Sequence, residues 1–185
     1  MQLGPEKVTT KKENEYILRS IGPDNVEEFL NFMRQVSADT HFMSRYSDEV
    51  GSDEYEVLAE KARLKTLYED SRQGMISVFD GDRIIGNVAI RTAGKGRKTN
   101  HRCSIGIGIR KEYTGQGLGS ILMDHAIEFA KSVGYEIMEL GVLSDNTPAR
   151  SMYEKMGFTE WGCLPDAFHL DEGDSLDEIT MYKEL

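Results

Sequence analysis

The sequence predicts an α/β fold, in which short strands alternate with amphipathic helices along one chain. Apolar residues recur at helical spacing in several segments and form short β-type runs in others. The turn Asp80-Gly81-Asp82 joins two such runs, because Asp-Gly readily adopts the positive φ angles of a hairpin. A glycine-rich loop later leads from a strand directly into a helix, which is an arrangement that suits an anionic ligand.

In the N-terminal half we expect a strand, two helices and a hairpin. Residues 1–14 are polar and charged and are expected to be a flexible lead-in, followed by a single domain over residues 15–185. A strand over 16–21 ends at Gly22, and Pro23 suits the first turn of a helix that continues to Val36. Strands are expected at 75–79 and 83–92. The inner face of the second helix is expected to be formed by Tyr55, Leu58, Ala62 and Leu67.

The C-terminal half continues the alternation of strands and helices. A strand over 103–110 contains Gly106 and Gly108, and glycine inside a strand often marks a close approach of the backbone to a partner. The next helix ends at Gly134 and is followed by a strand over 136–143. Asn146 is expected to cap a short helix that Gly157 closes. Two final strands are expected at 158–164 and 178–183.

Composition favours a soluble protein and argues against a nucleic-acid partner. The net charge of −10 opposes binding to a phosphate backbone, and no apolar run approaches the roughly 18 residues of a membrane helix. The polar N-terminus lacks the apolar stretch of a secretory signal. Cys103 and Cys163 are too few for a disulfide framework and lack metal-site spacing. We therefore expect a cytoplasmic protein with no membrane partner and no metal.

Acidic residues are concentrated near the C-terminus. Residues 160–185 hold eight acids and one base, Lys183, which gives −7 of the total charge. Such a surface can attract a cationic amine. It can equally be a solvated face that aids solubility, which is the commoner role of a run of like charges.

The loop from Thr114 to Ser120 contains three alternating glycines between a strand and a helix. Unpaired amides at the helix start, together with the helix dipole, can bind a pyrophosphate, although a purely structural turn is the alternative. A P-loop is excluded because Gly119 is not followed by Lys and then Ser or Thr. A dinucleotide fingerprint would need Gly or Ala at position 120 or 122, where the chain has Ser120 and Leu122.

Residues 103–158 resemble the Gcn5-related N-acetyltransferase family. The loop motif of this family is Arg or Gln, two residues, Gly, one residue, and Gly or Ala; Gly117 and Gly119 fill the last two positions, and Thr114 stands at the first. The second motif of the family is matched at its usual spacing by Asn146, Ala149, Tyr153, Gly157 and Phe158.

The resemblance implies a mixed, mostly antiparallel central sheet of six or seven strands flanked by about four helices. It also implies acetyl-CoA as a co-substrate, lying where the strand before the loop splays from the next strand. The backbone of Ile107, Gly108 and Ile109 would pair with the pantetheine arm and thioester. The residues expected to contact the coenzyme are Ile107, Gly108, Ile109, Thr114, Gly115, Gln116, Gly117, Leu118, Gly119, Ser120 and Asn146.

Two positions bear directly on catalysis. Thr114 lacks the reach of the family's Arg or Gln, so Gln116 or Arg110 is expected to compensate if coenzyme affinity is kept. Tyr153 resembles the family's general acid, which protonates the departing thiolate; a packed tyrosine is the alternative. No general base can be assigned among Glu139, His101 and His41.

The resemblance implies transfer of an acetyl group from acetyl-CoA to a primary amine by direct attack in a ternary complex. The acceptor is expected to be a small amine, a polyamine or a protein N-terminus, with residues 41–46 and the second helix as its wall. An acyl-CoA-binding or sensing module with little catalysis is the alternative; Thr114 is compatible with it, whereas the retention of both Asn146 and Tyr153 speaks against it. Dimers are common in the family, so a homodimer is compatible with the sequence.

Overall fold

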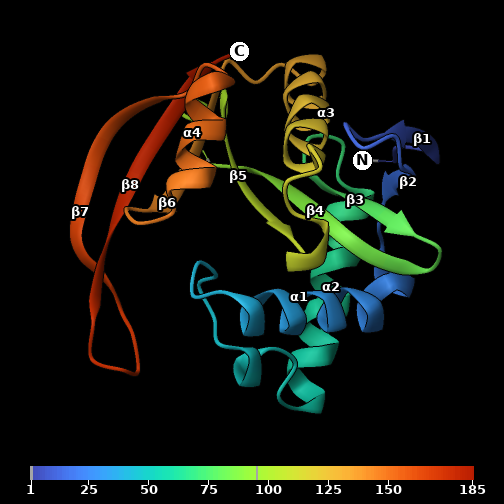
Figure 1. The fold of residues 1–185 in the computed structure, drawn as a ribbon. Coiled ribbons are helices and arrows are strands. Elements are labelled where there is room, and N and C mark those ends of the chain that lie inside the picture. The colour runs from blue at the N-terminus through green and yellow to red at the C-terminus, as the bar shows by residue number, and fades with distance from the viewer. Residues whose placement is uncertain (1, 95) are drawn as a thin grey trace.

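The computed structural model describes residues 2–94 and 96–185, which form one eight-stranded sheet with helices on both faces (Figure 1). The strands are β1 (Glu6–Thr9), β2 (Glu15–Ser20), β3 (Gly74–Asp80), β4 (Arg83–Thr92), β5 (Arg102–Ile109), β6 (Ile137–Leu143), β7 (Thr159–His169) and β8 (Ser175–Glu184). The helices are α1 (Val26–Asp39), α2 (Glu54–Glu69), α3 (Leu118–Ser132) and α4 (Thr147–Lys155), with single 3-10 turns at Pro23–Asn25, Ser47–Glu49 and Lys111–Tyr113.

The sheet order is β1-β2-β3-β4-β5-β6-β8-β7. Every neighbouring pair is antiparallel except β5 and β6, so the predicted mixed, mostly antiparallel sheet is confirmed. The strand number is eight rather than six or seven. The additional strand is β1, which lies inside the predicted lead-in and pairs with β2 from Glu6 opposite Leu18 to Thr9 opposite Glu15. Met1 of that lead-in lies outside the described residues.

Strand β1 was not predicted, because its sequence, EKVT, is mostly polar. Of its four residues only Val8 is buried, and it packs into the main hydrophobic core with Tyr16 and Leu18 of β2. An edge strand of this kind needs only one inward side chain, which is too short a pattern to be recognised. The basic connection at 93–99 is a loop in its described part, and Lys95 lies outside the described residues.

Two hydrophobic cores lie on the two faces of the sheet. One contains Leu122 and Ala126 of α3 together with Val88 and Ile90 of β4. The other contains Phe32 of α1 and the inner residues of α2, packed against the opposite face of the sheet. Alternation along β4 serves both cores, because successive side chains of a strand point to opposite faces.

The predicted inner face of α2 was wrong at Tyr55, Leu58 and Ala62, which are exposed, and right at Leu67. Tyr55 and Leu58 are 80% and 58% exposed, whereas Leu64 and Leu67 are buried. Val57 packs against the same core as these two leucines, which gives one helical face at positions 57, 64 and 67. Packing against the second hydrophobic core therefore decides which face of α2 is buried.

Strands β5 and β6 pair over three residues and then separate. Their parallel register joins residues 102–104 to residues 137–139, although β5 continues to Ile109 and β6 to Leu143. Beyond Ser104, β6 keeps its antiparallel pairing with β8, and β5 keeps its pairing with β4. The sheet therefore opens at its centre, and the divergence expected from the resemblance is present.

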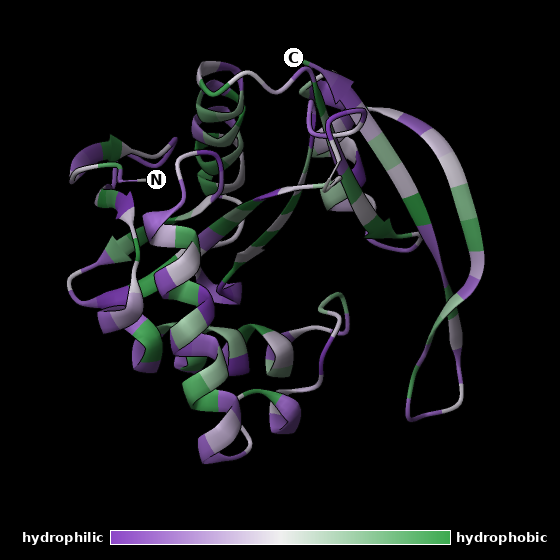
Figure 2. Cartoon of the chain, turned by 180° about the vertical axis from the view of Figure 1, so that it is seen from behind, coloured by the Kyte–Doolittle hydropathy of each residue, from purple (hydrophilic) through white to green (hydrophobic). Residues whose placement is uncertain are grey.

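The last two strands are longer than predicted and form an extended ribbon. In Figures 1 and 2 the β7–β8 pair extends away from the helices, and its far part lies beyond the body of the sheet. Trp161 and Leu164 on β7 are 61% and 56% exposed.

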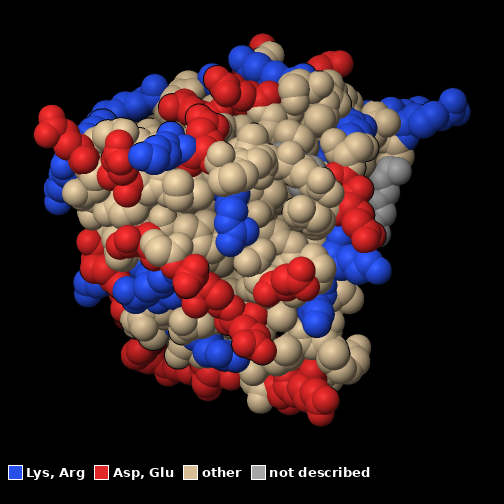
Figure 3. Space-filling view, turned by 90° about the vertical axis from the view of Figure 1, so that its right-hand side faces the viewer, with Lys and Arg blue, Asp and Glu red and all other residues tan. Residues whose placement is uncertain are grey.

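Both charge signs are interspersed on the face shown in Figure 3, so no single sign dominates that face. Within the described ranges, no helix has the length and apolar character needed to cross a membrane.

The two cysteines occupy opposite environments, which leads to a labelling prediction. Cys103 is fully buried, and burial followed by the negative charge of Glu139 raises the pKa of its thiol to about 12, whereas Cys163 is exposed. At pH 8 about one Cys103 thiol in ten thousand is ionised, and the thiolate is the reactive form. An alkylating reagent followed by mass spectrometry should modify Cys163 in the native protein and Cys103 only after denaturation. Equal labelling of both in the native state would contradict the packing of β5.

Candidate active site

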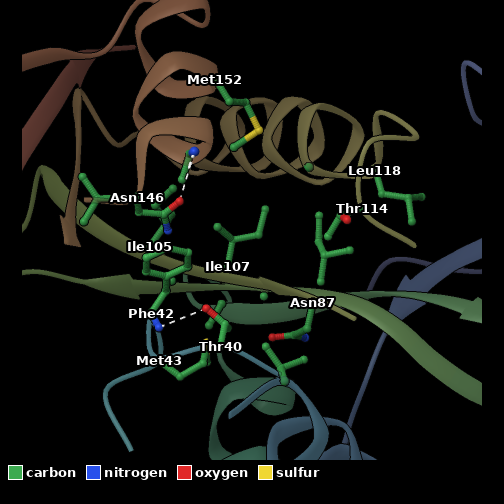
Figure 4. A pocket seen from close by; sticks show the side chains of 18 of the residues that line it. Thr40, Phe42, Met43, Asn87, Ile105, Ile107, Thr114, Leu118, Asn146 and Met152 are labelled. Carbon is green, nitrogen blue, oxygen red and sulfur yellow. Dashed lines mark hydrogen bonds between the residues drawn. The ribbon is translucent and has the colours of Figure 1, made fainter. Parts of the chain in front are cut away.

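A cavity of about 970 Å³ lies where β5 and β6 separate (Figure 4). Its walls come from the β5 backbone, the start of α3, the start of α4 and the loop after α1. In Figure 4, Ile105 and Ile107 lie on the strand at the centre, with Asn146 and Met152 above and Phe42 and Met43 below. Segments distant in sequence therefore meet at one opening of the sheet.

The glycine-rich loop presents free amides to this cavity. Gly115 and Gly117 have φ angles of 71° and 90°, which favour glycine, and α3 begins directly afterwards at Leu118. The amides of residues 115–117 donate to no other described residue, and those of 118–120 lie in the first helical turn, before Ile121 donates to the Gly117 carbonyl. With the exception of Gln116, residues 114–120 line the cavity, so this edge can bind an anion.

Gln116 and Arg110 are engaged elsewhere. Gln116 is buried, and its Oε1 accepts hydrogen bonds from Asn14 Nδ2 at 3.1 Å and from the Tyr16 hydroxyl at 3.4 Å. Arg110 is 1% exposed and donates to the Ile84 carbonyl and to Glu28. Neither side chain lines the cavity, so neither stands in for the Arg or Gln that Thr114 replaces.

Two lysines lie closer to the loop, and sequence reasoning missed both. Lys111 lines the cavity. The Lys11 amide donates to the Gln116 carbonyl at 3.1 Å, and its side-chain carbons cover Gly117, where an added Cβ would lie 3.2 Å from Lys11 Cγ. The Thr114 hydroxyl donates to the Lys111 carbonyl at 2.8 Å, which fixes the turn without supplying a cation.

The edge of β5 that faces the gap lacks a strand partner. Residues 105–109 have no pairing with β6, so their backbone groups on that side are free to bond an extended ligand. Ile107, Gly108 and Ile109 all line the cavity. A Cβ on Gly106 would meet nothing within 4 Å, so the cavity continues over this part of the strand.

Asn146 caps helix α4 and also lines the cavity. Its Oδ1 accepts a hydrogen bond from the Ala149 amide at 3.3 Å and so caps α4, while its side-chain amide NH2 remains available on the cavity side (Figure 4). Met152 on the same helix packs against the start of α3, and a Cβ on Gly119 would lie 2.7 Å from its sulfur. Gly119 therefore allows α3 and α4 to approach one another closely.

Tyr153 is buried within the cavity wall. It is 5% exposed, its ring lies 5.8 Å from that of Phe158, and burial raises the pKa of its phenol to about 12. Its hydroxyl forms no hydrogen bond with any residue in the described ranges. It is therefore a protonated, unengaged donor at neutral pH.

The three sequence candidates for a general base do not line the cavity. Glu139 bonds Arg102, His41 pairs with Asp145 at 2.7 Å, and the His101 carbonyl accepts from Glu136. Glu178 of β8 does line it, and its carboxylate overlaps the space that any side chain on Gly141 would occupy. Nothing in the acidic C-terminal sequence distinguishes Glu178 from its neighbours; its register opposite Leu143 on β6 does so.

The loop after α1 is fastened over the cavity at two points. Residues 40 and 42–44 line it, and Phe42 and Met43 point toward the β5 strand in Figure 4. His41 pairs with Asp145 before α4, and the Tyr46 hydroxyl accepts from the Asp171 amide at 2.7 Å. Helix α2 contributes one residue to the wall, Arg63.

Comparison with known proteins agrees with this architecture. Residues 35–158 match the model of the acetyltransferase (GNAT) family. Streptothricin acetyltransferase of Streptomyces lavendulae is 33% identical over 132 residues, which make up 70% of this chain and 64% of that protein. The first four curated relatives are matched over 17% to 64% of their lengths, so the chain covers less than two thirds of each.

Solved structures extend the likeness over nearly the whole fold. A GNAT-family acetyltransferase of Streptococcus pneumoniae superposes with a TM-score of 0.83 at 29% identity, covering 92% of this chain and 99% of that one. The Salmonella typhimurium protein yncA, solved with its cofactor acetyl-CoA, shares the fold with a TM-score of 0.76 at 16% identity, over 93% and 95% of the two chains. With its opened sheet, its glycine-rich loop and these matches, the chain belongs to the acetyltransferase (GNAT) family.

Proposed function

We propose that the protein transfers an acetyl group from acetyl-CoA to a primary amine. The observation that carries this proposal is the divergence of β5 and β6 beside the free amides of residues 115–120, with Tyr153 in the same cavity. Free strand-edge groups suit the amide-bearing pantetheine arm, and the start of α3 suits a pyrophosphate. Lys111 and Lys11 would supply positive charge that Thr114 does not.

The proposed mechanism is direct attack in a ternary complex. The amine nitrogen bonds to the thioester carbonyl carbon, the carbon–sulfur bond breaks, and the thiolate leaves with the electron pair. Holding both reactants in one cavity removes much of the entropic barrier. The unpaired β5 amides near Ile107 are suited to hydrogen-bonding the carbonyl oxygen as negative charge develops on it.

Two proton transfers complete the proposed reaction, one to the departing thiolate and one from the attacking nitrogen. The Tyr153 phenol, with its pKa raised to about 12 by burial, would protonate the sulfur of the departing thiolate. The attacking nitrogen loses its extra proton to a base, and Glu178 is the carboxylate of the cavity wall that lies beside β6. Glu178 lies at the gap between β5 and β6, and this position supports its proposed role as the general base.

The names of the relatives point to more than one class of acceptor. Similar proteins are named for diverse acceptors, including streptothricin in Streptomyces lavendulae and mycothiol in Pseudarthrobacter chlorophenolicus. We therefore propose a primary amine on a small molecule or a peptide N-terminus. An acyl-CoA-binding module without catalysis is disfavoured by the unengaged hydroxyl of Tyr153, which has no structural bond to maintain.

A thiol-release assay tests the proposed function. Purified protein is mixed with acetyl-CoA and an amine panel of amino acids, polyamines, aminoglycosides and peptides with free N-termini, and free CoA is measured. Release that depends on one amine class supports the proposal and identifies that class. Tight acetyl-CoA binding without release from any amine would favour the binding module.

Replacing Tyr153 tests the proposed acid. Because the hydroxyl has no partner among the described residues, Tyr153→Phe should keep the fold and acetyl-CoA binding, while kcat falls about a hundredfold or more. The wild-type rate should show no loss attributable to Tyr153 below about pH 11, because the active form is the protonated phenol, whose pKa is about 12. Steady-state kinetics with parallel calorimetric titration measures both quantities. An unchanged kcat would remove Tyr153 from the mechanism.

Replacing Gly117 tests the loop, and Gly134 offers a matched control at the other end of α3. Their φ angles are 90° and 81°, so alanine at either position should cost about 1–3 kcal/mol of stability through backbone strain. At Gly117 the added Cβ would also lie 3.2 Å from Lys11 Cγ, whereas at Gly134 it would meet nothing within 4 Å. Gly117→Ala should also weaken acetyl-CoA binding about tenfold, because it disturbs the amides of the anion site. Gly134→Ala should leave the binding constant unchanged. Equal binding losses in both variants would mean that only helix stability matters.

A further inference from the structure

An arginine pair lies in the cavity wall away from the glycine-rich loop. Arg63 of α2 and Arg91 of β4 both line the cavity. Arg63 bonds Glu60 through its Nε and Nη2, but its Nη1 is buried and has no hydrogen-bond partner in the part of the chain that the structure describes. The backbone of Arg91 pairs with Ser104, but its guanidinium forms no hydrogen bond or ion pair with any described residue. Arg63 therefore holds one donor without a partner in the cavity wall, and the unpaired guanidinium of Arg91 lies near enough to be repelled by it.

Electrostatics agrees with this geometry. Burial, and then the positive charge of Arg63, lower the pKa of Arg91, while Glu60 opposes them. Arg91 is nonetheless an exposed residue that lines the cavity, so its guanidinium stays accessible to a ligand. Two arginines against one glutamate leave one excess positive charge, and a buried donor without a partner costs free energy until a ligand satisfies it.

The arginines lie beside a floor that is free of large side chains. On β4, Asn87, Ala89 and Arg91 share the face toward α1 and α2, and their β5 partners are Gly108, Gly106 and Ser104. Asn87 uses its Nδ2 to bond the Ile76 carbonyl and the Ser77 hydroxyl, which leaves its Oδ1 on the cavity side. Nothing lies within 4 Å of a Cβ added to Gly106, so a small molecule can lie over this floor.

The remaining charged residues of the wall are placed differently. Lys111 belongs to the turn before the glycine-rich loop, Asp39 ends α1, and Glu178 covers Gly141 at the gap between β5 and β6. Arg91 pairs with Ser104, about 7 Å along the strand from Gly106. A carboxylate beside the gap and an arginine pair farther along β4 match a molecule with an amine at one end and an anionic group at the other.

We propose that the acceptor is a small amine that carries an oxyanion, such as a carboxylate or a phosphorus oxyanion, and that Arg63 and Arg91 bind this group. This inference rests on the proposed function, because it assigns the acceptor to the same cavity. Paired guanidinium groups bind planar or tetrahedral oxyanions through parallel charge-assisted hydrogen bonds. The cationic acceptor suggested by the acidic C-terminal sequence is not favoured, since Glu178 is the one member of that group of eight acids that lines the cavity.

The test compares amines that differ only in the anionic group. The standard L-amino acids are assayed beside their primary amides, and aminoalkylphosphonates beside the corresponding amino alcohols, in wild type and in Arg91→Gln. Arg91 is chosen because its side chain has no bond to lose, whereas Arg63 also holds Glu60. Arg97→Gln, on the exposed loop outside the cavity, removes the same charge as a matched control, and Arg91→Lys keeps the charge without the fork.

The wild-type protein should favour an anionic member over its neutral counterpart by about tenfold or more in kcat/KM. Arg91→Gln should bring this ratio close to one through KM, Arg91→Lys should restore part of it, and Arg97→Gln should retain it. Whether the preferred group is a carboxylate or a phosphonate identifies the oxyanion. Equal or better use of the neutral amines or of polyamines, or an unchanged ratio in Arg91→Gln, would overturn the inference while leaving the acetyltransferase proposal intact.

Calorimetric titration of the CoA-bound protein separates the two proposals further. If no amine releases thiol, acetyl transfer has failed, but preferential binding of the acid over its amide, lost in Arg91→Gln, still supports the oxyanion site. If acid and amide bind the CoA-bound protein equally, or neither binds, the oxyanion site is refuted whatever the outcome of the turnover assay.

Discussion

The structure depends on the separation of two parallel strands after three residue pairs. Backbone amides and carbonyls are costly to bury without partners, so a sheet normally keeps neighbouring strands paired along their length. Here β5 loses its β6 partner beyond Ser104, although both strands continue. The separation is sustained because each strand keeps its antiparallel neighbour on the other side, β4 for β5 and β8 for β6. The cost of the unpaired edge is offset when a ligand supplies the missing hydrogen bonds.

The glycine-rich loop is held in place by parts of the chain that do not touch the cavity. Gln116 is bonded by Asn14 and Tyr16, and its carbonyl accepts from Lys11, so the β1–β2 hairpin fixes the loop from behind. The N-terminal segment, which the sequence predicted to be a flexible lead-in, thus helps to hold the glycine-rich loop in place. Preorganised amides would lower the entropy cost of the anion binding proposed for this loop.

The sequence predicted most of the fold because periodicity and turn chemistry are local. The DGD hairpin, the helix after the glycines and the Asn146 cap follow from a few adjacent residues, and the structure confirms each of them. What failed depends on contacts between distant segments. The burial of Leu64 rather than Leu58, the pairing of β1, and the engagement of Gln116 by Asn14 and Tyr16 are decided by packing, which no single window of sequence contains.

One side of the cavity is built largely from backbone groups and the opposite side from side chains. This difference explains why the sequence indicates the proposed coenzyme site but not the proposed acceptor site. The proposed coenzyme side consists largely of backbone groups on β5 and the α3 loop, so its requirement appears as glycines at fixed spacing. The opposite side consists of side chains contributed by α1, α2, β4 and β8, among them Arg63, Arg91 and Glu178. Each of these belongs to an element whose local pattern reports only a helix or a strand. Acceptor choice therefore depends on tertiary arrangement, and side chains there can change without disturbing the backbone geometry that defines the family.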